Sequence, residues 1–100
     1  MKRATRAEVL AAEVRVPTHV VYRAFPAETV VLNLETGQYH GLNPTGGRML
    51  EALAEAGTIA QAAEQLETEF EVDRERLETD LLGLCRLLAQ RDLIHVSAEI

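Results

Sequence analysis

The hydrophobic period of this chain changes once, from two residues to about 3.6, and the change at Asn43 and Pro44 restricts the fold more than any other feature. Before it, β-branched and aromatic residues form three short runs, at residues 19–25, 28–34 and 38–42. Such runs between turn-forming residues are typical of strands. After it, apolar residues recur at helical spacing. The pattern therefore predicts strands first and helices second.

The middle run alternates with the period of two that a half-buried strand requires. One face carries Val30, Leu32 and Leu34, and the other carries Val31 and Asn33. The joint to the third run ends in Gly37, which suits a three-residue hairpin loop with a left-handed last position. We therefore expect the second and third strands to be antiparallel neighbours.

Helix-capping residues divide the second half into three helices. Asn43 is an N-cap with proline at the first helical position, and Gly57 suits the left-handed end of that helix. Thr58 begins the second helix with a capping box, and Asp73 can cap the third. The chain is predicted to be α+β, a three-stranded antiparallel sheet followed by three helices, resembling a winged helix.

One hundred residues are enough for a single domain, which we place at residues 17–100. Residues 1–16 form a flexible N-terminal arm or a short accessory helix, because Pro17 ends their helical spacing. The net charge is −6, and residues 51–80 hold ten acids against two arginines, which disfavours nucleic acid. No apolar run is long enough to span a membrane or serve as a signal peptide. Together with a single cysteine, this favours the cytoplasm.

Catalytic chemistry has little support in the residues. Cys85 lies in an apolar helical stretch and fits the core better than a nucleophilic site. His19, His40 and His95 stand in separate segments without the spacing of metal ligands. We therefore expect no enzyme activity, no metal and no cofactor.

The third strand is expected to have one unpaired edge. No charged residue stands between Thr36 and Gly47, although edges are usually protected by charge, proline or a bulge. Gly41 allows another backbone to approach closely. Such an edge suits the addition of a peptide as an extra strand. The alternative is that the N-terminal arm covers it.

The last helix has a wider apolar surface than one core requires. Its inward seam is Leu77, Leu81, Leu84 and Leu88. Leu87 lies beyond the seam on the flank that also holds Gly83 and Asp80. If this flank faces the third strand, the two elements form a groove with an apolar floor; alternatively, Leu87 packs against the C-terminal segment at Leu93 and Ile94.

Four stretches of the chain carry a family resemblance. The pattern V-x-x-P-x-H-V-x-x-R, the run VVLNLETGQYHGLNPTG, and the helical segments TIAQAAEQLETEFEVD and TDLLGLCRLLAQRDLI resemble the PqqD-like RiPP recognition elements. The similarity is greatest to the discrete leader-recognition proteins of lasso-peptide biosynthesis. It covers residues 16–96, and the run from Gly37 to Gly46 is its most specific part.

The resemblance implies a non-catalytic peptide chaperone that binds the leader of a ribosomally made precursor. It would present the leader to a cysteine-protease partner and then to a macrocyclase. In the family the leader is an added strand on the third strand, with its apolar side chains against the third helix. Carried onto this chain, the peptide-binding residues are Tyr39, His40, Gly41, Leu42, Arg76, Leu77, Asp80, Gly83, Leu84 and Leu87.

Two other functions remain open from the sequence. A chaperone of the same superfamily in another modified-peptide pathway would share the mechanism with a different precursor. A winged-helix DNA-binding regulator would share the architecture but would normally carry a basic recognition surface. The acidic residues 64–71 are a solvated helix surface or, as the alternative, a face for the protease.

Overall fold

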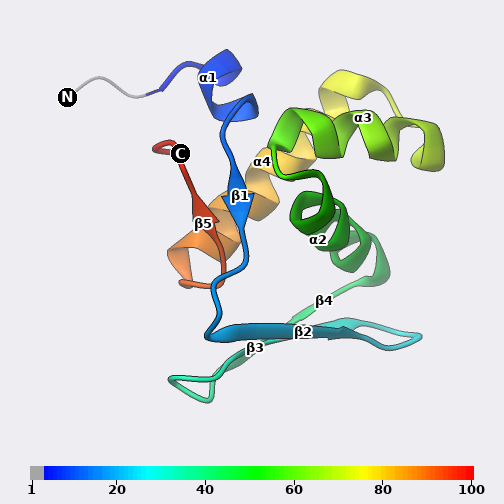
Figure 1. The fold of residues 1–100 in the computed structure, drawn as a ribbon. Coiled ribbons are helices and arrows are strands. Elements are labelled where there is room, and N and C mark those ends of the chain that lie inside the picture. Colours follow the sequence, from blue (N-terminus) through cyan, green and yellow to red (C-terminus); the bar gives the residue numbers. More distant parts are fainter. Residues whose placement is uncertain (1–3) are drawn as a thin grey trace.

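The computed structural model describes residues 4–100 and confirms the α+β class (Figure 1). A three-stranded antiparallel sheet in the order β2-β3-β4 is covered by helices on one face. The elements in chain order are α1 (Arg6–Leu10), β1 (Val14–Arg15), β2 (Val20–Ala24), β3 (Thr29–Asn33), β4 (Tyr39–Leu42), α2 (Pro44–Ala56), α3 (Ile59–Phe70), α4 (Arg74–Gln90) and β5 (His95–Val96).

The hairpin between β3 and β4 forms as expected. The two strands are antiparallel, with Val31 opposite His40 and Leu32 opposite Tyr39. Gly37 has a φ of 76°, a left-handed conformation that glycine adopts without strain. The Asn33 side-chain oxygen accepts hydrogen bonds from the backbone N–H groups of Glu35 and Thr36, at 2.9 and 3.2 Å. This Asx turn fixes the register of β4.

The alternation of β3 did not show which of its two faces is buried, and the structure does. The buried face of β3 consists of Thr29, Val31 and Asn33, whereas Val30 and Leu32 turn toward solvent. Asn33 is buried because the loop N–H groups satisfy its side chain. The more apolar face of the strand is therefore the outer one.

The helix ends agree with the capping residues, with one correction. The Asn43 side chain accepts the Gly46 N–H, the Thr58 side chain accepts the Gln61 N–H, and Gly57 has a φ of 92°. Asp73 precedes α4 as predicted, but its side chain makes no capping hydrogen bond. The prediction of a side-chain cap at Asp73 is therefore wrong.

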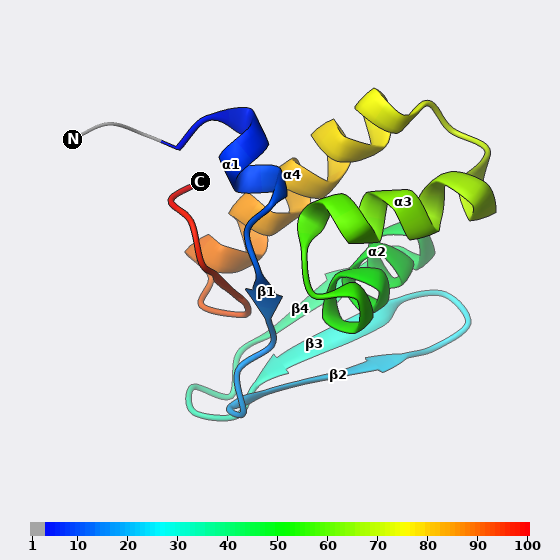
Figure 2. The same ribbon diagram turned by 45° about the horizontal axis from the view of Figure 1, so that its top comes forward.

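The core lies between α2, α3, α4 and the inner face of the sheet (Figure 2). Leu50, Leu53, Leu66 and Leu81 are at most 1% exposed. Cys85 is also fully buried, and burial raises the pKa of its thiol to about 12. The structure therefore agrees with a core position for this cysteine.

The N-terminal segment contributes two elements that the strand pattern did not predict. Thr5 and Glu8 form a capping box at α1, and Val9 is buried. Strand β1 pairs with β5 in a second, two-stranded sheet, with Val14 opposite Val96. The alternative of a short accessory helix thus agrees with the described residues, while the domain boundary at residue 16 stays a prediction. Within residues 4–100, no helix is long and apolar enough to cross a membrane.

Candidate functional site

Strand β4 forms one border of the three-stranded sheet. Among the described residues its only strand partner is β3, since β1 pairs with β5 instead. The alternative in which the N-terminal arm covers this edge therefore does not apply to residues 4–100. The β4 edge is open in the structure.

The backbone groups on this edge follow from the ladder. The Asn33 N–H donates to the Gln38 carbonyl at 2.9 Å, so Gln38 bonds toward β3. Because bonding direction alternates along an antiparallel strand, His40 and Leu42 also bond toward β3. Tyr39 and Gly41 then direct their N–H and C=O groups to the open edge. These two residues offer the hydrogen bonds that an added strand requires.

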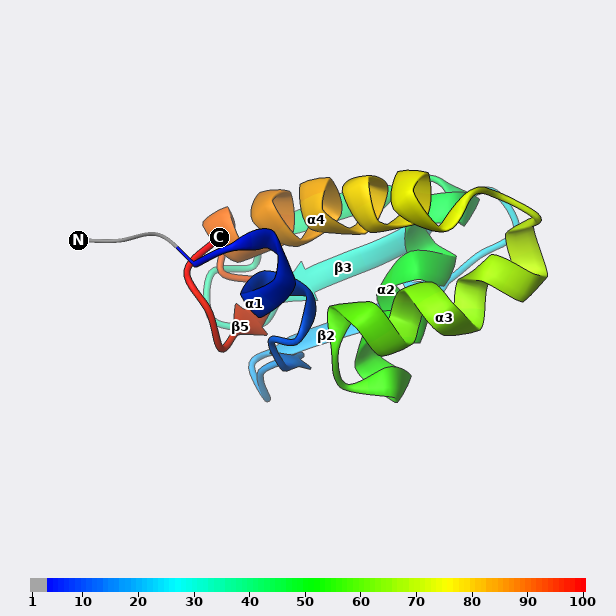
Figure 3. The same cartoon turned by 90° about the horizontal axis from the view of Figure 1, so that it is seen from above.

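An apolar cleft of about 430 Å³ lies between β4 and α4. Its lining residues are Gly41, Leu42, Asn43, Thr45, Gly46, Met49, Asp80, Gly83, Leu84 and Leu87. Seen from above, β3 lies between α4 and β2, so α4 borders the sheet on the side away from β2 (Figure 3). The flank of α4 that the helical spacing identified does face the third strand of the sheet.

Gly83 leaves room in this cleft. A Cβ placed on Gly83 would have no heavy atom of the described chain within 4 Å outside the backbone of its own helix turn. Glycine inside a helix costs about 1 kcal/mol relative to alanine, and packing inside the chain gives no reason for it here. A Cβ on Gly41, by contrast, would lie 2.6 Å from a side-chain oxygen of Glu28.

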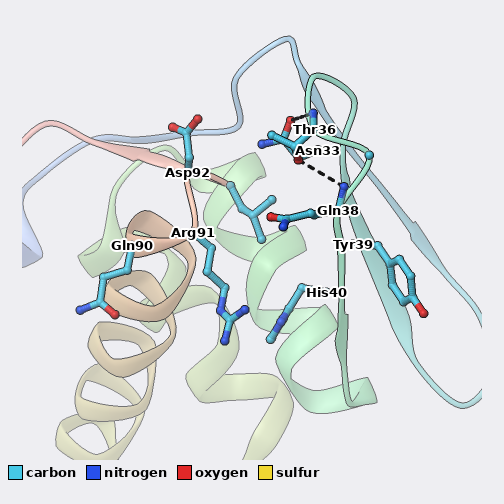
Figure 4. A pocket seen from close by; sticks show the side chains of 10 residues that line it. Asn33, Thr36, Gln38, Tyr39, His40, Gln90, Arg91 and Asp92 are labelled. Atoms are coloured by element: carbon cyan, nitrogen blue, oxygen red, sulfur yellow. Dashed lines mark hydrogen bonds between the residues drawn. The ribbon is translucent and has the colours of Figure 1, made fainter.

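A larger and more polar cavity of about 750 Å³ continues along β4 past the C-terminal end of α4 (Figure 4). The His40 and Arg91 side chains point toward one another across it, and Gln38 lies above them. The Tyr39 side chain points away from the cavity. The linings of the two cavities adjoin at His40 and Gly41 on β4, and we call the first cavity the apolar section and the second the polar section.

The structure gathers most of the predicted site residues. Gly41, Leu42, Asp80, Gly83, Leu84 and Leu87 meet in the apolar section, and His40 lines the polar section. Leu77 is 1% exposed and belongs to the core, so it does not line the cleft. Arg76 is exposed on α4 but lines neither section, and Tyr39 borders the cleft through its backbone alone.

The sequence interpretation missed residues in both sections. Met49 and the α2 start line the apolar section, and Gln38, Gln90 and Arg91 line the polar section. The α2 start could have been found, because α2 follows β4 directly in the chain. Arg91 belongs to a turn after α4 whose direction no local pattern shows.

One group of side chains could hold a metal ion. His19, Glu35 and Asp92 bring one ligand atom each to within 4.8 Å of one another. His19 Nε2 lies 3.3 Å from an Asp92 carboxylate oxygen, and both acids are exposed. The contact between the His19 ring and Asp92 holds two of these three groups together without a metal.

The fold and the cleft define a class of protein: a small winged-helix-like α+β domain with an open sheet edge beside its last helix. A family model described as coenzyme PQQ synthesis protein D (PqqD) matches residues 28–94. The chain belongs to the PqqD family. This confirms the resemblance inferred from the motifs.

Two solved structures are similar over nearly the whole chain. TbiB1 in complex with the TbiA(beta) leader peptide has a TM-score of 0.76 and 32% identity, covering 85% of this chain and 99% of that chain. A lasso peptide synthetase B1 complexed with the leader peptide has a TM-score of 0.73 and 26% identity, covering 84% and 99%. No curated protein sequence matches the chain.

Proposed function

We propose that this protein binds the leader segment of a ribosomally made precursor peptide, as an added strand on β4. The observation that carries the proposal is the open edge at Tyr39 and Gly41 beside a cleft against α4. Two similar proteins are named as leader-peptide complexes, one of them a lasso peptide synthetase B1. The same role in lasso-peptide biosynthesis is therefore proposed here.

Strand alternation gives the bound leader two sets of side chains. Successive side chains of a strand point to opposite faces of a sheet. One set would enter the cleft between β4 and α4, and the other would lie beside Tyr39 on the outer face. Cleft-facing residues near Leu84 and Leu87 should be apolar, because these half-buried leucines form the floor.

The polar section favours a different leader chemistry. His40, Arg91 and Gln38 line it together with Asp92, so it holds donors and one exposed carboxylate. Arginine binds carboxylates with two hydrogen bonds. We expect an acidic or amide side chain of the leader at this end. An Arg91→Ala variant should then weaken binding, and higher salt should reduce the difference from the unchanged protein.

The protein would act without chemistry of its own. Its cysteine is buried with a raised pKa, which opposes formation of a reactive thiolate. Binding would hold the precursor for a cysteine protease that removes the leader and for a macrocyclase that closes the core peptide. Membership of the PqqD family accounts for the winged-helix-like architecture, so the fold gives no reason to propose a DNA-binding regulator.

A pair of proline variants on opposite edges tests strand addition. Gly41→Pro removes an N–H that faces the open β4 edge and no N–H of the β3–β4 ladder, and its Cβ requires only that the flexible Glu28 side chain move aside. Ala24→Pro is the matched control on β2, since the neighbouring Phe25 N–H donates to the Glu28 carbonyl at 2.7 Å and the Ala24 N–H therefore faces outward. The probe is a fluorescein-labelled leader peptide of a candidate precursor from the same genome, measured by fluorescence polarisation.

We expect Gly41→Pro to weaken leader binding by at least about tenfold, through a lost hydrogen bond and steric conflict. Ala24→Pro should bind normally. Leu84→Asp, which places a charge in the apolar section, should also abolish binding. Normal binding by folded Gly41→Pro and Leu84→Asp proteins would rule out the cleft as the leader site. The TbiA(beta) leader serves as a second probe for how far recognition extends.

A further inference from the structure

The Glu28 carboxylate lies over Gly41 at the open edge of β4. A Cβ placed on Gly41 would lie 2.6 Å from Glu28 Oε1 and 3.8 Å from the Glu28 carboxyl carbon. Thr29 is buried on the inner face, so its neighbours Glu28 and Val30 belong to the outer face. Gly41 pairs with Val30 and shares that face. The carboxylate therefore takes the place that a side chain at position 41 would otherwise fill.

The Glu28 carboxylate has no cationic partner in the described part of the chain. No salt bridge within residues 4–100 includes Glu28, which is exposed. Arg23 is on the same face, since it pairs with Val30 across β2 and β3, but its guanidinium carbon lies 5.6 Å from the centre of the Phe25 ring. The carboxylate is therefore free to pair with a cation that arrives on β4.

A leader strand added to β4 would bring one side chain next to this carboxylate. Gly41 directs its N–H and C=O groups to the open edge, so one leader residue lies directly beside it. The side chain of that residue falls on the outer face, because neighbouring residues of adjacent strands share a face. Its Cβ would lie about 4.5–5.5 Å from a Cβ position on Gly41, within reach of Glu28 for a lysine or arginine. Glu28 thus replaces Gly41 as the cross-strand neighbour of this leader residue.

A second carboxylate borders the same place from the cleft. Asp80 lines the apolar section together with Gly41, and it is exposed. Arg76 precedes Asp80 by one helical turn, but neither residue takes part in a salt bridge within residues 4–100. An added strand would therefore pass between two carboxylates at this end of the site, one on each face of the sheet.

The start of β4 carries the opposite charge. The His40 and Arg91 side chains point toward one another in the polar section (Figure 4). Asp92 also lines this section, but its carboxylate lies 3.3 Å from the ring of His19. The charge along the open edge therefore changes sign, from carboxylates beside Gly41 to a guanidinium at the start of the strand.

We propose that Glu28 selects a lysine or arginine of the leader at the position beside Gly41. The inference rests on the proposed function, because it concerns the register of the bound leader. Backbone hydrogen bonds alone specify strand register weakly, so an added strand could slip along β4 or bind in reverse. A leader cation at Glu28 and an acidic or amide side chain at Arg91 match the site in one register and one direction only. Asp80 favours a further cation on the cleft side.

The geometry also restricts the spacing of the two selected leader residues. The residue beside Gly41 faces outward with Glu28, whereas the residue near Arg91 faces into the cleft. Successive side chains of a strand alternate between the two faces of a sheet. The two selected positions therefore lie an odd number of residues apart in the leader.

The test is a charge scan of the leader against charge-reversed proteins. Each residue of the fluorescein-labelled leader is replaced singly with lysine and with glutamate, and binding is measured by fluorescence polarisation. The proteins are the unchanged chain, Glu28→Lys, Arg91→Glu and the control Glu64→Lys. Glu64 is exposed on α3, so its reversal changes the net charge as much as Glu28→Lys does, but away from β4.

We expect one leader position at which lysine binds the unchanged protein roughly two- to fivefold more tightly than glutamate does. Glu28→Lys should reverse this preference at that position alone. Arg91→Glu should reverse the opposite preference at a position an odd number of residues away. Glu64→Lys should retain both preferences, and higher salt should reduce both in the unchanged protein.

Two results would overturn the selection while leaving leader binding intact. Either no leader position prefers lysine in a way that depends on Glu28, or Glu28→Lys and Glu64→Lys change binding alike, which would assign the effect to net charge. Glu28→Gln, which keeps the shape and removes the charge, should abolish the preference without reversing it, and circular dichroism checks that each variant is folded. If the unchanged protein binds neither this leader nor the TbiA(beta) leader, the proposed function fails as well.

Discussion

Replacing Gly83 with alanine should raise stability and lower peptide affinity at the same time. In the free protein a Cβ at this position has no neighbour within 4 Å beyond its own helix turn, so the substitution creates no overlap. An interior helical glycine costs about 0.8–1.0 kcal/mol relative to alanine. The free energy of unfolding should therefore increase by about that amount, and Tm should rise by about 4–8 °C.

The effect on binding has the opposite sign if a guest strand fills the cleft. A methyl group inserted into a well-packed contact costs about 1–3 kcal/mol, which corresponds to roughly 5- to 150-fold in affinity. Gly83→Leu should reduce binding further, because leucine reaches across the apolar section toward β4. Urea unfolding gives the stability, and fluorescence polarisation with the labelled leader gives the affinity.

The control for this experiment is Thr68→Ala on α3, which raises helix propensity at an exposed site outside the cleft. It should add about 0.5 kcal/mol of stability and leave leader binding unchanged. If Gly83→Ala and Gly83→Leu both bind the leader as tightly as the unchanged protein, no peptide occupies this turn of α4. A loss of stability in Gly83→Ala would contradict the claim that a Cβ at this position meets no other atom in the free protein.

Three further predictions concern the body of the protein. Gly47→Ala should cost about 1–3 kcal/mol in urea unfolding, because its Cβ would overlap the β-branched side chain of Thr29; Gly46→Ala, whose Cβ meets its nearest neighbour at 3.3 Å, should cost less. Leu81→Ala should cost about 2–5 kcal/mol by the same measurement, since Leu81 is 0% exposed, and a loss below about 1 kcal/mol would contradict its place in the core. Cys85 should react with Ellman's reagent at pH 8 only after unfolding in urea, because burial raises its pKa to about 12. Fast labelling of the folded protein would contradict the burial of this thiol. Since the pKa of the thiol is higher in the folded than in the unfolded protein, where it is about 8.5, the free energy of unfolding should decrease as pH rises above about 8.5.

The sequence predicted the fold where local chemistry decides it. Asn43 with Pro44 set the start of α2, and Gly37 and Gly57 set a turn and a helix end, because each residue type fits few backbone conformations. The pairing of β1 with β5 was missed, since two-residue strands at opposite ends of a chain leave no periodic signal.

The candidate site was predictable in its helical part and less so in its strand part. Helical spacing placed Asp80, Gly83 and Leu87 on one flank, and the structure puts that flank against β4. The same spacing could not separate Leu77, which is buried, from Leu84, which lines the cleft, because both lie on the inward seam.

The alternation of apolar and polar residues could not predict which face of the sheet is buried. Period two assigns residues of β3 to two sets without saying which set is buried. The set with Asn33 is buried because the hairpin loop satisfies its side chain, a contact that depends on tertiary geometry. Which face of the sheet is buried could therefore be found only in the structure.

The pairing of β1 with β5 brings the segments near both ends of the described chain together, and Figure 1 shows these two strands beside the helices, with the C-terminus on the side away from the three-stranded sheet. An affinity tag, a fluorescent protein or a whole catalytic domain could be joined at either end through a short linker without crowding the sheet. The same geometry would let this module work equally as a separate subunit or as one unit of a larger fused polypeptide.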